Sequence, residues 1–122
     1  MEPTAFVDFA KGLLQEAQAT GDEPKLRTVV NRAYLGALLE SARNLEPLRV
    51  ESYPPTGRFY GLVERDLGSE VGPGAGSKLA TLRDYRKDAD YDITNALPSW
   101  MPGRAVGVAE EILRVLREKF RS

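Results

Sequence analysis

The chain has 122 residues, of which 42% are hydrophobic and 29% charged, and its formal net charge is −1. These values are typical of a soluble globular protein with a single domain over residues 1–122, and they exclude a basic field over the whole molecule. Cysteine and histidine are both absent. Their absence excludes disulfides, an ordinary zinc site, a thiol nucleophile and an imidazole base. No metal and no cofactor is therefore expected. The lack of cysteine, of a long apolar run and of a secretory signal favours a cytoplasmic protein without membrane association.

Apolar residues recur at helical spacing in the first half of the chain. The pattern predicts a helix over about residues 4–19 that stops at Gly21. A second helix follows over residues 22–45, with Asp22 as its N-cap and Pro24 in its first turn. The prolines of residues 46–57 predict a connector, and residues 58–67 fit a short helix.

Glycine and proline dominate residues 68–77, where we expect a mobile loop that ends at Ser77, the N-cap of the next helix. Pro98 and Pro102 predict an irregular segment over residues 95–104, and the final helix covers residues 105–120. Trp100, in the irregular segment, is expected to cover the bundle rather than to stack on a base. The predicted fold class is all-α, with four principal helices and a short one.

One helical stripe in the second half of the chain contains an arginine among apolar residues: Leu79, Leu82, Arg86, Ala89 and Ile93. A guanidinium on a core-facing stripe requires a carboxylate or another acceptor. Asp90 lies one turn further on, and Glu40 lies on the inner stripe of the second helix, so either residue is a candidate for a structural ion pair. Alternatively, Arg86 and Arg83 line a cleft and bind phosphate or another anion.

Three further features of the sequence have structural interpretations. Tyr34 is expected in the core, with its hydroxyl reaching a polar partner. Aspartates at alternate positions (Asp88, Asp90 and Asp92) point apart on a helix and do not form a metal cage. The second helix is also apolar on its outer face, so it is either the central helix of a bundle or part of a subunit interface, for which Leu35, Leu38 and Leu39 are the candidates.

Several stretches of the chain resemble HEPN domains. VVNRAYLGALLESARNL is similar to the second helix of that family, and LATLRDYRKDADYDI to its third helix, in the branch with an Arg-x-x-Ala-Asp-Tyr-Asp motif. TGRFYGLVERDL resembles the intervening segment. The resemblance covers roughly residues 4–120 and implies an up-and-down helical bundle that forms a homodimer. It also implies a place in toxin–antitoxin or defence-type systems, either as a metal-independent endoribonuclease or as a partner of a nucleotidyltransferase-type protein.

The resemblance places the family arginine on Arg86 and the family alanine on Ala89, whereas Tyr91 occupies the position of the catalytic histidine. A tyrosine has an ordinary pKa of about 10 and is a poor base at neutral pH. The first interpretation is therefore a non-catalytic accessory module that binds RNA or nucleotide phosphate. One alternative is a ribonuclease that uses Arg86 with Tyr91 or Asp90, and another is a purely structural dimerisation module.

Overall fold

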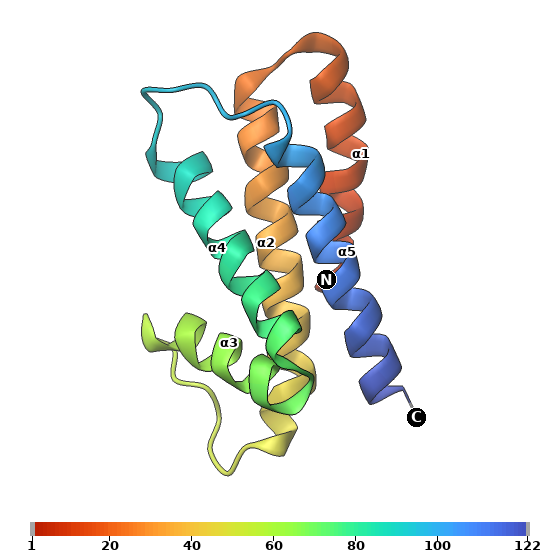
Figure 1. Cartoon of the computed structure of the whole chain (residues 1–122), viewed down its shortest axis with the longest axis vertical. Helices are drawn as coiled ribbons and strands as arrows, with labels where there is room; N and C mark the ends of the chain where they lie inside the picture. The colour runs from red at the N-terminus through yellow and green to blue at the C-terminus, as the bar shows by residue number, and fades with distance from the viewer. Residues whose placement is uncertain (1, 122) are drawn as a thin grey trace.

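The structure, a computed structural model, describes residues 2–121, which form five α-helices and no strand (Figure 1). The helices are α1 (Thr4–Thr20), α2 (Glu23–Leu45), α3 (Arg58–Glu70), α4 (Pro73–Tyr91) and α5 (Met101–Phe120), with a 3₁₀ turn at Glu46–Leu48. Four long helices and the shorter α3 confirm the predicted all-α bundle. None of the helices in this described range combines the length and the apolarity that a bilayer crossing requires.

The central element is α2, which packs against each of the other four α-helices (Figure 1). As predicted, α2 begins at the N-cap Asp22, whose side chain accepts a hydrogen bond from the Lys25 backbone N–H at 3.2 Å. The turn before it depends on Gly21, whose φ of 65° lies in the left-handed region. This two-residue turn makes α1 and α2 antiparallel.

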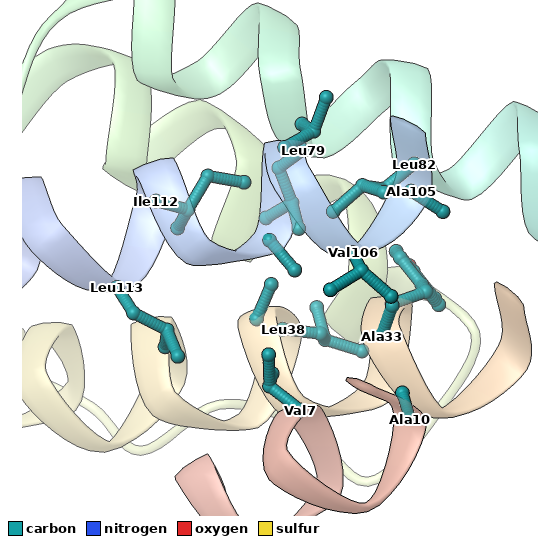
Figure 2. Close-up of a cluster of buried hydrophobic side chains, with 14 of the residues drawn as sticks. Val7, Ala10, Ala33, Leu38, Leu79, Leu82, Ala105, Val106, Ile112 and Leu113 are labelled. Carbon is teal, nitrogen blue, oxygen red and sulfur yellow. The ribbon is translucent and has the colours of Figure 1, made fainter. Parts of the chain in front are cut away.

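The core lies where α1, α4 and α5 cover α2, and Figure 2 shows its aliphatic side chains interdigitating between these helices. The closest approach is at Gly36, where an added Cβ would lie 2.5 Å from Val7 Cγ2 of α1. Leu38 is 1% exposed and belongs to this core. Its assignment to an outer, subunit-facing surface is therefore wrong, because Leu38 is buried inside the bundle; Leu35 and Leu39 are half-buried.

The glycine-rich segment is not a mobile loop, and this prediction was wrong. α3 continues to Glu70 and α4 begins at Pro73, so Ser77 lies inside α4 instead of capping it. Proline is well suited to a first helical turn because its missing N–H has no partner there. Two of the glycines allow the helices to cross closely: a Cβ on Gly76 would lie 3.0 Å from the Gly68 Cα.

The α4–α5 connection covers residues 92–100 instead of the predicted 95–104, because α5 begins at Met101 with Pro102 in its first turn. Ile93, predicted on the core-facing stripe, follows the end of α4 at Tyr91 and is exposed. Trp100 precedes α5 and stays 56% exposed, in edge contact with Tyr85 at 5.7 Å between ring centroids. It therefore covers the bundle only in part. Arg27 of α2 holds the connection: its Nη1 donates to the carbonyl oxygens of Ala89 (3.0 Å) and Asp92 (2.8 Å) at the end of α4.

Candidate functional site

A cavity of about 330 Å³ opens between α3 and α4, and Tyr34 of α2 forms part of its wall. Four of its lining side chains are cationic and none is acidic. The lining residues are Tyr34, Gly57, Arg58, Tyr60, Gly61, Arg83, Arg86 and Lys87. We refer to this cavity as the cationic pocket.

The geometry of α4 explains why three of the four cations share this wall. Arg83, Arg86 and Lys87 are spaced by three and four residues, so a helix places them on one face. The fourth cation, Arg58, is the first residue of α3, so the amino end of that helix also faces the pocket. A helix amino terminus carries partial positive charge and adds to the attraction for anions.

Arg86 is accommodated on the α4 stripe because it meets a carboxylate. Its Nε lies 3.0 Å from Asp90 Oδ2, an ion-pair contact whose angle does not make a hydrogen bond. The same Asp90 oxygen accepts a hydrogen bond from Asn31 Nδ2 of α2, also at 3.0 Å. Of the two partners considered from the sequence, Asp90 is therefore the one that pairs with Arg86.

Glu40 does not reach Arg86, and that candidate pairing is wrong. Its side chain is buried (5% exposed), as the stripe predicted, but it is held within α2. Oε1 accepts hydrogen bonds from Arg43 Nε and from Asn44 Nδ2, both at 3.0 Å. Because Arg43 and Asn44 follow Glu40 by three and four residues, all three side chains lie on the same face of α2.

Arg83 pairs across the helix crossing with Glu64 of α3, with 3.2 Å between Nη1 and Oε2. Burial raises the pKa of Glu64, and the neighbouring Arg83 opposes this rise without cancelling it. This ion pair links α3 to α4 directly beside the cationic pocket.

Several polar atoms around the pocket are buried and make no hydrogen bond within the described residues: Tyr34 Oη, Glu64 Oε1, Arg83 Nε and Arg86 Nε. Only one other buried side-chain atom in that range, Glu40 Oε2, shares this property. Burial also raises the pKa of Tyr34 far above its usual range, so the hydroxyl keeps its proton as a donor. Buried polar groups are normally satisfied, so this concentration makes the cationic pocket the candidate functional site.

The remaining sequence candidates lie outside the lining of the pocket. Tyr91 is 69% exposed, and its ring centroid is 5.5 Å from Arg86 Cζ. Asp90 lies behind Arg86, held by Asn31. No group of three or more acidic side chains within residues 2–121 is arranged to hold a metal ion.

Sequence reasoning identified Arg83 and Arg86 but missed Arg58, Lys87 and Glu64. A signal for Lys87 was present, because it follows Arg83 by four residues and so shares its helix face. Arg58 and Glu64 carried no such signal, since they join the site only through the packing of α3 on α4. Searches of family models, curated proteins and solved structures return no match for this chain.

Proposed function

We propose that this chain is a non-catalytic binding module that holds phosphate groups of RNA or of a nucleotide in the cationic pocket. The observation that carries the proposal is the convergence of four cations on one cavity whose wall contains a buried hydroxyl donor without a partner. Arginine and lysine side chains are the usual ligands of phosphate, and arginine binds it through two nitrogens. The net charge of −1 shows that this attraction is local, not global.

The resemblance to HEPN domains supports the cellular setting that we propose. The motif arginine of that family corresponds to Arg86, which lies in the wall of the pocket. On this basis we propose a cytoplasmic, homodimeric accessory module of a toxin–antitoxin or defence-type system, acting beside a nucleotidyltransferase-type or other defence protein. Sedimentation at micromolar concentration tests the dimer, and a monomeric mass would contradict it.

Ribonuclease chemistry has weaker support than binding. General base catalysis requires a group that can take a proton from the RNA 2′-hydroxyl. Asp90 is already engaged by Arg86 and Asn31, and the phenol of Tyr91 is a weak base at neutral pH. We expect RNA to stay intact with the purified protein between pH 5 and pH 9, with or without EDTA. Cleavage that Arg86→Ala abolishes would instead establish the ribonuclease alternative.

The binding test compares two lysines that differ in their distance from the pocket lining. Lys87 lines the pocket, whereas Lys119 lies in the last turn of α5; neither forms an ion pair within residues 2–121. Fluorescence anisotropy with a labelled single-stranded RNA would measure affinity at several salt concentrations for the wild type, Lys87→Gln and Lys119→Gln.

We expect Lys87→Gln to weaken RNA binding and to reduce the slope of log K against log salt by roughly 0.7 to 1, the value for one lost phosphate contact. Lys119→Gln should leave both quantities unchanged. Equal losses in the two variants would show that binding follows general charge, and would overturn the assignment of the pocket.

A further inference from the structure

Two properties of the cationic pocket bear on its ligand: its charge balance and its supply of unpartnered donors. From these two properties we infer that it takes the terminal phosphate monoester of a nucleotide, whether free or at the end of a single strand, in preference to an internal phosphodiester. This inference rests on the proposed phosphate-binding function and specifies the chemical class of its ligand.

The charge balance of the pocket suits a dianion. Two of the four lining cations are matched, Arg83 by Glu64 and Arg86 by Asp90. Arg58 and Lys87 have no ion-pair partner within residues 2–121, so four cations less two carboxylates leave two positive charges. A phosphate monoester carries a charge of about −1.5 to −2 at pH 7, whereas an internal diester carries one negative charge.

The unpartnered donors match the acceptors of a terminal phosphate. Tyr34 Oη and Arg83 Nε each carry a hydrogen and have no hydrogen-bond partner among the described residues, whereas Arg86 Nε faces Asp90 Oδ2 at 3.0 Å. A monoester presents three non-bridging oxygens as strong acceptors, and a diester presents two. Glu64 does not line the cavity; its Oε2 pairs with Arg83, and its Oε1 is buried without a hydrogen-bond partner among the described residues.

An exposed aromatic ring beside the pocket suits the nucleoside part of the ligand. Tyr91 follows Lys87 by one helical turn and is 69% exposed, with its ring 5.5 Å from Arg86 Cζ. Bases stack on exposed aromatic side chains next to phosphate-binding cations in single-strand-binding proteins. The phosphate would therefore lie in the pocket and the base on Tyr91.

The experiment measures the affinity of one single-stranded RNA with a 5′-phosphate and the same RNA with a 5′-hydroxyl, using the wild type and Tyr34→Phe. Tyr85→Phe is the matched control, because Tyr85 is a tyrosine of α4 that does not line the pocket. We expect the wild type and the control to prefer the phosphorylated RNA by about tenfold or more, as for a charge-assisted group of contacts. Tyr34→Phe should reduce this preference severalfold, because the affinity for the 5′-phosphate RNA falls more than the affinity for the 5′-hydroxyl RNA.

Competition assays then distinguish the sources of the phosphate. Adenosine 5′-monophosphate should displace the phosphorylated RNA at lower concentration than inorganic phosphate does, and Tyr91→Ala should remove that difference. If inorganic phosphate competes equally well, the assignment of a nucleotide is overturned. If both RNAs bind the wild type equally and Lys87→Gln weakens both, the terminal-phosphate inference fails while the proposed function stands. If neither RNA binds, both fail.

Discussion

Replacing Tyr34 with phenylalanine provides a test of the unpartnered hydroxyl that does not depend on any ligand. The Tyr34 side chain is fully buried, and its Oη makes no hydrogen bond within the described residues. A buried polar group without a partner costs about 1–3 kcal/mol of folding free energy. Tyr34→Phe removes that cost and leaves the ring in place, with a small loss of packing where the oxygen was. We therefore expect the variant to be more stable than the wild type by about 1 kcal/mol.

Tyr53→Phe is the matched control, and it should change stability in the opposite direction. The Tyr53 hydroxyl donates to Asp66 Oδ2 at 2.8 Å, so its removal loses a hydrogen bond to a carboxylate, worth about 1.5–3 kcal/mol. Urea unfolding followed by circular dichroism would give the free energies of unfolding of both variants. Thermal unfolding should place Tyr34→Phe about 4 °C above the wild type, as expected for a domain of this size. A Tyr34→Phe variant less stable than the wild type would refute the reasoning, because its hydroxyl would then have a stabilising partner such as an ordered water.

Three further predictions concern the scaffold. Gly36→Ala should destabilise the protein by about 1–3 kcal/mol, because the Cβ of the alanine would lie 2.5 Å from Val7 Cγ2. Urea unfolding would measure this loss, and an unchanged unfolding midpoint would show that α1 can shift freely. Burial raises the pKa of Asp66, but hydrogen bonds from Arg49, Tyr53 and Arg65 outweigh it, so the pKa is lowered overall. Its carboxylate therefore stabilises the fold above about pH 4, and the stability difference between wild type and Asp66→Asn should shrink as pH falls below that value; a constant difference from pH 7 to pH 2.5 would contradict this. Arg27→Lys should lower the free energy of unfolding by about 1.5–3 kcal/mol, because one ammonium cannot reach all the carbonyls at the end of α4. Amide hydrogen exchange in residues 92–97 should become faster, and unchanged exchange there would contradict the capping role of Arg27.

The apolar periodicity of the sequence was sufficient to predict the four long helices. The prediction was wrong in the segment that is rich in glycine and proline. Composition alone made residues 68–77 a loop, because glycine and proline usually interrupt helices. In the structure Pro73 occupies a first turn, and Gly68 and Gly76 are the contact points of two crossing helices. Local propensity could not reveal this, since the benefit of the missing side chains comes from tertiary packing.

The candidate site could be predicted from the sequence only where one helix carries it. The α4 stripe was enough to identify Arg86, to require a partner for it, and to offer Asp90 one turn away. Glu40 was an equally plausible partner for Arg86, because it lies on the inner apolar stripe of α2. The angular position of a residue on α2, however, does not show which residue of α4 it faces. The assignment of Leu38 to an outer face of α2 was wrong for the same reason, because Leu38 is apolar and buried inside the bundle.

The cationic pocket itself follows from the way α3 and α4 meet. Their close contact is at Gly68 and Gly76, near the short turn that joins them, and Glu64 and Arg83 bridge the helices further along. Beyond that bridge the amino end of α3 and the second half of α4 separate, which leaves a cavity between Arg58 and Lys87. The glycine crossing thus sets the angle of the two helices, and the angle determines that cations distant in sequence share one recess. A helix pair that packed tightly along its whole length would close this cavity, and the exposed Arg58 and Lys87 would then share no recess with the half-buried Arg83 and Arg86.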